Sequence, residues 1–175
     1  MYNWSKTAAM PIKSYKIVDG NSGPVVEDIG FAKAYYRKSL FISEGNTYSW
    51  QTRSERINLI RKGVPVSSIE VLGDRMNRPI KAILGLVGMP QTTYNKRKSE
   101  HSFLDSRNTE LVLLIIELLD YGTEVFNREE DKFLRWLGKP NLSLQGQSPI
   151  ELMDTVSGLE EVKSCLDRLE FGALA

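Results

Sequence analysis

Cysteine and histidine are almost missing from this 175-residue chain, which has one of each, Cys165 and His101. A zinc site needs three or four ligands at defined spacing, and a disulfide within the chain needs a second cysteine. No Gly-x-Ser-x-Gly turn and no Gly-x-x-x-x-Gly-Lys phosphate loop occurs either. We therefore predict no catalytic residue, no metal and no cofactor, and an enzyme that works with carboxylates alone is the enzyme class left open.

Long hydrophobic runs are also lacking. The longest, residues 111–116, is far shorter than the about 20 residues that span a bilayer, and residues 1–11 contain no core of signal-peptide length. The hydrophobic fraction of 41% and the charged fraction of 26% are typical of a globular protein. We expect no membrane partner and a location in a reducing cytosol, so the protein is predicted to be cytoplasmic.

The net charge of +1 conceals an uneven distribution. Residues 51–100 contain ten basic and four acidic side chains, whereas residues 101–175 contain seven basic and fourteen acidic ones. A basic block is typical of a nucleic-acid surface, because Lys and Arg displace counterions from phosphate. An acidic block would be repelled by the same DNA, so the pattern predicts two surfaces with different partners. The alternative is that both blocks are solvated faces that balance across the fold.

Helical periodicity dominates the chain from residue 52 onward, and an all-α fold is expected. The predicted helices are residues 52–62, 67–76, 79–87, 90–99, 107–126, 128–137, 149–153 and 158–170. Capping motifs with Glu three positions later support four of the starts, at Ser67, Asn127, Ser148 and Ser157. At the third of these, Pro149 also occupies the first helical position, which favours a helix start.

The predicted helix 107–126 is apolar on nearly every side. Such a helix lies in the core or covers its second apolar face with another chain. We therefore expect a homodimer, or a larger assembly, with contacts from this helix. The predicted dimerisation residues are Leu111, Leu114, Ile115 and Leu118.

The first 50 residues are different in character. Residues 19–24 form a turn or linker cluster, and the sequence Glu44-Gly45-Asn46 indicates a break. A helix is expected between about residues 26 and 40. Its candidate packing residues, with the residue that follows it, are Phe31, Ala34, Tyr35 and Phe41. An arm, a small helical cap and a dimerisation segment all fit this pattern.

Residues 79–99 have the pattern of a helix-turn-helix. A short apolar helix ends at Gly88, the turn buries Met89, and a polar helix starts at Gln91. Tyr94 is expected to face the core, which leaves the opposite side for base edges and phosphates. The predicted DNA-binding residues are Gln91, Thr92, Thr93, Asn95, Lys96, Arg97 and Lys98. The alternative is a helical hairpin with a solvated basic face.

From Leu84 to the last residue, the sequence resembles the antitoxins of the Xre/MbcA/ParS type. Residues 88–98, GMPQTTYNKRK, are similar to that family's turn and recognition helix. Residues 133–155, FLRWLGKPNLSLQGQSPIELMDT, are similar to the core of its toxin-binding domain. Gly158, Val162, Leu166, Arg168, Glu170, Phe171, Gly172 and Ala175 fit its terminal helix and tail.

The resemblance implies a protein of the bacterial cytosol with three parts. These are a variable N-terminal extension (1–50), a helix-turn-helix DNA-binding region (51–105), and a long linking helix with a small helical toxin-binding domain (106–175). The implied partners are operator double-stranded DNA and a RES-domain toxin, an enzyme that consumes NAD and whose active-site entrance the C-terminal domain covers. Through the DNA, the protein would repress its own operon.

The toxin-binding residues that the resemblance implies are Lys139, Asn141, Arg168, Glu170, Phe171, Gly172, Ala173, Leu174 and Ala175. Residues 139–147 fit a purely structural loop as well, since Pro140, Asn141 and Gly146 are ordinary turn residues. Trp136 and Cys165 are expected in the core. The alternative function is a helix-turn-helix regulator whose C-terminal domain binds another protein or a small ligand.

Overall fold

The computed structural model describes residues 38–172, and they are mostly helical. The elements are β1 (Ser39–Ser43), β2 (Asn46–Trp50), α1 (Arg53–Lys62), α2 (Ser68–Met76), α3 (Ile80–Leu86), α4 (Gln91–Ser99), α5 (Ser106–Val125), α6 (Glu130–Leu137), the 3-10 helix η1 (Leu142–Leu144), α7 (Pro149–Leu152) and α8 (Val156–Glu170). Every helix predicted from residue 52 onward is present, within two residues of its expected ends. None of the helices in this range combines the length and the apolar character that a membrane span requires.

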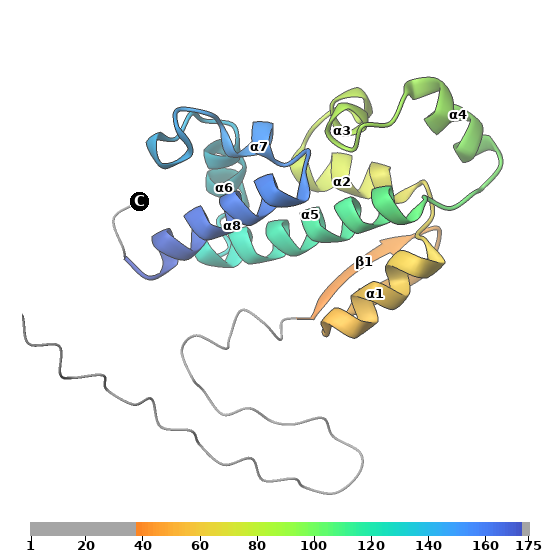
Figure 1. Ribbon diagram of the computed structural model, residues 1–175, viewed down its shortest axis with the longest axis horizontal. Coiled ribbons are helices and arrows are strands. Elements are labelled where there is room, and N and C mark those ends of the chain that lie inside the picture. The colour runs from red at the N-terminus through yellow and green to blue at the C-terminus, as the bar shows by residue number, and fades with distance from the viewer. Residues whose placement is uncertain (1–37, 173–175) are drawn as a thin grey trace, which may run out of the picture. The chain divides into compact units, whose positions relative to one another are not determined.

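α5 is the central helix of the core. It packs against α1, α2, α6 and α8, and α8 runs alongside it (Figure 1). Leu111, Ile115 and Leu118 are at most 6% exposed, and Leu114 is half-buried. The chain's own elements therefore cover both apolar faces of α5. Leu111, Ile115 and Leu118 therefore have little surface to offer a second copy, and the dimer contact predicted for them and for Leu114 stays a prediction.

Residues 39–50 form an antiparallel β-hairpin, which the all-α expectation did not include. In β1, buried and exposed side chains alternate strictly, the period-two pattern of a half-buried strand. Glu44 and Gly45 adopt left-handed conformations with φ of 51° and 75°, as a two-residue hairpin turn requires. The predicted break at residues 44–46 is confirmed as this turn.

The helix expected over residues 26–40 is wrong at residues 39 and 40, which belong to β1. The candidate packing residues Phe31, Ala34 and Tyr35 lie outside the described residues, whereas Phe41 is buried as expected. Alternation of apolar and small polar residues in Ser39–Ser43 overrides the helical spacing that Phe41 shares with the residues before it.

The hairpin is attached to the helical core through α5. Trp50 is 3% exposed, and its indole N–H donates a hydrogen bond to the Glu117 carboxylate. Arg56 of α1 forms an ion pair with the same carboxylate. Residues 39–50 of the predicted N-terminal extension therefore contribute to the same hydrophobic core as the helices.

Two helix starts follow the expected chemistry. The Glu151 carboxylate accepts hydrogen bonds from the Ser148 backbone N–H at 2.8 Å and from its hydroxyl at 2.7 Å, and Pro149 is the first helical residue. This confirms the prediction at α7. Thr52 and Glu55 form a full capping box at α1 that the sequence analysis did not identify.

The other three capping predictions are wrong. The Ser67 hydroxyl donates to the Glu44 carboxylate at 2.9 Å instead of accepting from α2, so the tertiary contact wins over the local cap. Asn127 has φ of 55°, and α6 is capped at Glu129. α8 starts two residues earlier than expected, because the Thr155 hydroxyl accepts from the Gly158 N–H at 3.1 Å.

Gly122 allows α5 and α6 to approach closely. A Cβ at this position would lie 2.2 Å from ring carbons of Phe133, which is 1% exposed. We expect Gly122→Ala to lower the free energy of unfolding by about 1–3 kcal/mol, because the buried ring must move. Gly85→Ala in α3 is the control, since no atom lies within 4 Å of its Cβ position and alanine favours a helix. Urea denaturation measures both, and equal stability of the two variants would contradict the packing.

Candidate functional site

The turn between α3 and α4 holds the polar helix α4 in a fixed orientation. Gly88 has φ of 67°, and the Met89 N–H donates to the Leu84 carbonyl at 2.9 Å. Met89 is 5% exposed and Tyr94 is 4% exposed, so both sides of the turn are anchored in the core. This burial confirms that Tyr94 faces inward.

The outward side of α4 carries the polar residues expected there. Gln91, Thr92, Asn95 and Lys96 are exposed, whereas Thr93 is half-buried. The Gln91 amide donates to the Asn95 side-chain oxygen at 2.9 Å, so these two amides orient each other. The surface can offer hydrogen-bond donors and acceptors together with the Lys96 ammonium group.

Two of the three consecutive cations of α4 have carboxylate partners. Lys98 forms an ion pair with Glu70 of α2, and Arg97 forms one with Asp105 at 3.2 Å. Glu70 also accepts a hydrogen bond from the Tyr94 hydroxyl at 2.7 Å. Of these three predicted DNA-binding cations, Lys96 is the one for which the described residues provide no ion pair.

The hydrogen bonds from Lys98 and then from Tyr94 lower the pKa of Glu70. The Glu70 carboxylate in turn raises the pKa of Lys98. Because the folded-state pKa of Glu70 is lowered, its contribution to stability is present above its ordinary pKa and is lost as the pH falls through the lowered value. The link between α2 and α4 is therefore intact at neutral pH.

We expect Glu70→Gln to strengthen non-specific DNA binding. Lys98 then loses the carboxylate that neutralises it, while an amide can still accept the Tyr94 hydrogen bond. One further phosphate contact should steepen the slope of log K against log salt by about one. Fluorescence anisotropy with a random-sequence duplex at several salt concentrations measures this slope. Asp74→Asn on the exposed side of α2 is the control, and equal slopes for both variants would show that a released Lys98 does not reach phosphate.

The second predicted site lies at the other end of α5 from α4, where α6, α7 and the end of α8 gather (Figure 1). Phe126, Phe133 and Trp136 form a cluster with ring centroids 5.7–6.1 Å apart. Trp136 packs on the core as expected, and Cys165 is fully buried. The aromatic cluster and the α5–α8 contact hold this end together.

Tyr121 fastens the last turn of α8 to α5. Its hydroxyl lies 2.6 Å from the Asp167 carboxylate and 2.5 Å from the Glu170 carboxylate. Burial first, and then these two carboxylates, raise the pKa of Tyr121, so the phenol stays protonated as a donor. Glu170, predicted to contact a toxin, therefore has a structural partner within the chain.

The remaining predicted toxin-binding residues differ in their exposure. Lys139 is exposed, and Arg168 is half-buried with its guanidinium 3.9 Å from Glu161. Phe171 is 56% exposed, and Gly172 has φ of 65°, the left-handed conformation that follows a helix end. Ala173, Leu174 and Ala175 lie outside the described residues.

Asn141 is committed to the loop that it starts. Its side-chain oxygen accepts from the Ser143 N–H at 2.9 Å, and its amide group donates to Cys165 Sγ at 3.5 Å. The structure thus supports the structural role for Asn141 that the sequence analysis left open. The neighbouring Leu142 is 96% exposed and was not identified from the sequence.

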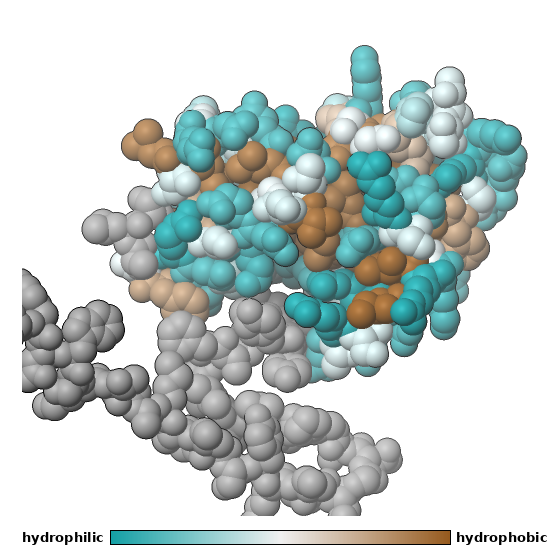
Figure 2. All heavy atoms as spheres, in the orientation of Figure 1, coloured by the Kyte–Doolittle hydropathy of each residue, from teal (hydrophilic) through white to brown (hydrophobic). Residues whose placement is uncertain are grey.

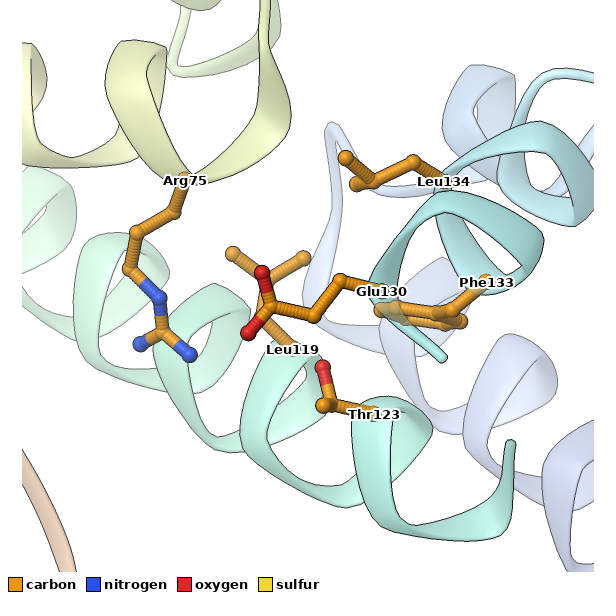
Figure 3. Close-up of a pocket in the computed structure, with 6 residues that line it drawn as sticks. All are labelled: Arg75, Leu119, Thr123, Glu130, Phe133 and Leu134. Atoms are coloured by element: carbon orange, nitrogen blue, oxygen red, sulfur yellow. The ribbon is translucent and has the colours of Figure 1, made fainter. Parts of the chain in front are cut away.

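A small pocket lies between α2, α5 and α6 (Figure 3). Arg75, Leu119, Thr123, Glu130, Phe133 and Leu134 line it. Its volume of about 70 Å³ is far below the roughly 300 Å³ at which cofactor and substrate pockets begin. Arg75 is already bound to Asp120 at 2.6 Å. The described residues also contain no group of three His, Cys, Asp or Glu that could hold a metal ion.

One family profile and several curated proteins are similar to this chain. Residues 122–172 match the family profile described as "Antitoxin Xre/MbcA/ParS C-terminal toxin-binding domain". The chain is 22% identical over 117 residues to a protein named Antitoxin Xre from Photorhabdus laumondii, covering 67% of this chain and 79% of the relative. A second Antitoxin Xre, from Yersinia enterocolitica, is 24% identical over 68% of this chain and 80% of the relative.

A third relative is the Prs ADP-ribosylating antitoxin of Sphingobium sp., which is 27% identical over 69% of this chain and 81% of its own length. Among solved structures, the crystal structure of the M. tuberculosis MbcT-MbcA toxin-antitoxin complex contains a similar chain. The TM-score is 0.49 at 15% identity, over 63% of this chain and 96% of that chain.

Proposed function

We propose that this chain, an antitoxin with an Xre/MbcA/ParS C-terminal toxin-binding domain at residues 122–172, has a RES-domain toxin as its target. Such a toxin consumes NAD. The C-terminal domain neutralises the toxin by covering its active-site entrance. The observation that carries this proposal is the match of α6, η1, α7 and α8 to a toxin-binding domain. An antitoxin acts by binding, so the chain itself catalyses no reaction.

The proposed toxin-binding surface combines Lys139 with the end of α8. Phe171 and Lys139 have exposed side-chain surface that a partner can contact. Arg168 and Glu170 also contribute to contacts of α8 within the chain. We therefore assign the direct contacts to Lys139, Phe171 and the residues after Gly172. Arg168, Glu170 and Asn141 position these contacts.

The second proposed activity is repression of the protein's own operon through α4. The helix presents amides, a hydroxyl and the Lys96 ammonium group outward and is anchored inward by Tyr94. This is the arrangement with which a recognition helix reads base edges in the major groove. Since α4 and the α6–α7 end lie at opposite ends of α5, operator and toxin can be bound at separate surfaces (Figure 1).

We expect the protein to sediment as a dimer at tens of micromolar, because a helix-turn-helix protein reads two half-sites through two-fold symmetry. Because positions 111, 115 and 118 are buried, exposed side chains are the better candidates for the interface. Leu40 is 47% exposed on β1, whereas Leu111 lies inside the core. We therefore expect Leu40→Ser to weaken the dimer more than Leu111→Val. A monomer both with and without operator DNA would contradict the proposal.

Co-expression with the product of the gene adjacent to this chain's own gene tests the main function. We expect the two proteins to co-purify and cell growth to be restored, together with the cellular NAD level. If the chain binds operator DNA but neither binds nor neutralises that toxin, it is a helix-turn-helix regulator with a different partner.

A further inference from the structure

The loop between α6 and α7 presents a leucine to solvent. Leu142 is 96% exposed, more than any other large hydrophobic side chain of residues 38–172. Figure 2 shows an isolated hydrophobic projection over this loop, surrounded by hydrophilic surface. A single exposed hydrophobic residue is common on proteins. What distinguishes Leu142 is the structure of the backbone that carries it.

The loop is closed by its own hydrogen bonds. The Asn141 N–H donates to the Gln147 carbonyl at 3.0 Å, and the Gly146 N–H donates to the Asn141 carbonyl at 2.9 Å. Gln145 and Gly146 both adopt left-handed conformations, with φ of 57° and 82°. The backbone on either side of Leu142 is thereby fixed in one turn.

Two contacts attach this turn to the rest of the domain. Leu144 is 3% exposed and packs into the core, although it is only two residues from Leu142. The Asn141 side chain donates to Cys165 Sγ in α8. The loop therefore holds Leu142 outward on a rigid base, and binding through it costs little conformational entropy.

The loop segment that carries Leu142 is itself uncharged, although the last third of the chain is acidic. Residues 140–150 contain no Asp, Glu, Lys or Arg. The Glu151 carboxylate that follows is turned back onto Ser148. Depletion of charge is typical of the buried centre of a protein interface.

We propose that Leu142 is the apolar anchor that inserts into an apolar recess of the toxin. The inference rests on the proposed function and adds a contact that lies apart from the end of α8. The toxin is the occupant because the whole loop lies within the toxin-binding domain at residues 122–172. A rigid backbone and an uncharged loop segment are typical of residues at the centre of a protein interface.

Affinity measurements with purified full-length proteins test this proposal. The probe is the purified product of the gene adjacent to this chain's own gene, which we propose to be the toxin, and the variants are Leu142→Asp and Leu142→Ala. We expect Leu142→Ala to weaken toxin binding by about 10- to 100-fold and Leu142→Asp by more, with unchanged thermal unfolding since the side chain is exposed. Leu142→Met is expected to restore most of the affinity. Ile42→Ser, a similarly exposed aliphatic side chain on β1, is the matched control and should bind normally.

The outcomes separate the anchor from the function itself. If wild-type protein binds the toxin and Leu142→Asp binds equally well, the anchor is wrong and the antitoxin function stands. A Leu142→Asp change that abolishes self-association but not toxin binding would assign the residue to a second copy of the chain and overturn the proposal. Absence of binding by the wild type would overturn the proposed function, and the anchor with it.

Discussion

Operator binding is expected to fall by about 10- to 100-fold when Lys96 and Arg97 are both replaced by alanine. Lys96 is exposed on α4, and half-buried Arg97 pairs with exposed Asp105 at 3.2 Å, a partly solvated ion pair that phosphate can replace at small cost. Phosphate contacts carry no sequence information, so operator and scrambled duplexes should lose affinity by similar factors. Fluorescence anisotropy over a range of salt concentrations measures both affinities and the salt slope, which should become shallower by about two.

Variants of the amide side chains provide the contrast to this double substitution. Asn95→Ala should cost on the order of 1–3 kcal/mol at particular base pairs and leave non-specific binding nearly unchanged. Because Gln91 and Asn95 are hydrogen-bonded to each other, Gln91→Ala should affect neighbouring base pairs rather than distant ones. Unchanged operator affinity in the Lys96→Ala, Arg97→Ala double variant would exclude α4 as the DNA-reading helix.

The helices could be predicted because their information is local. Apolar spacing and a few strong motifs, such as Ser148-Pro149-Ile150-Glu151, define where each helix lies. The hairpin was missed because Ser39–Ser43 is only five residues long, and its alternation is too short to compete with a longer apparent helical pattern. The failed caps have the same physical origin: Ser67 has a tertiary partner, Glu44, that is 23 residues away in the sequence.

The sites were predictable as regions and less so as individual residues. Spacing placed Tyr94 correctly, but it could not show that Glu70 neutralises Lys98 across 28 residues. In the α6–α7 loop, Asn141 was predicted to contact the toxin, but its side chain caps the loop itself by accepting from the Ser143 N–H. Leu142 could have been noticed from the sequence Leu142-Ser143-Leu144. Two leucines so close together in one short turn cannot both reach the core.

Removal of residues 171–175 is expected to abolish protection from the toxin. The helix α8 ends at Glu170, and Gly172 adopts the left-handed conformation that commonly follows a helix end. The Tyr121 contacts to Asp167 and Glu170 are retained in the truncated protein. The domain should therefore remain folded while it loses Phe171 and the last residues, which we propose to contact the toxin. Growth of cells that express the toxin with the truncated antitoxin measures protection, which we expect to match that of cells without antitoxin.

Two controls make this result specific. Thermal unfolding and operator binding of the truncated protein should stay close to those of the full chain, because Phe171 is 56% exposed and α4 is a separate part of the fold. A shorter truncation after Gly172 retains Phe171, which is 56% exposed, and shows whether the aromatic side chain or the last three residues block the toxin. Full protection by the longer truncation would contradict the prediction. Neutralisation would then depend on residues 139–155, where the rigid Leu142 loop is the one element that projects an exposed large hydrophobic side chain between α6 and α8.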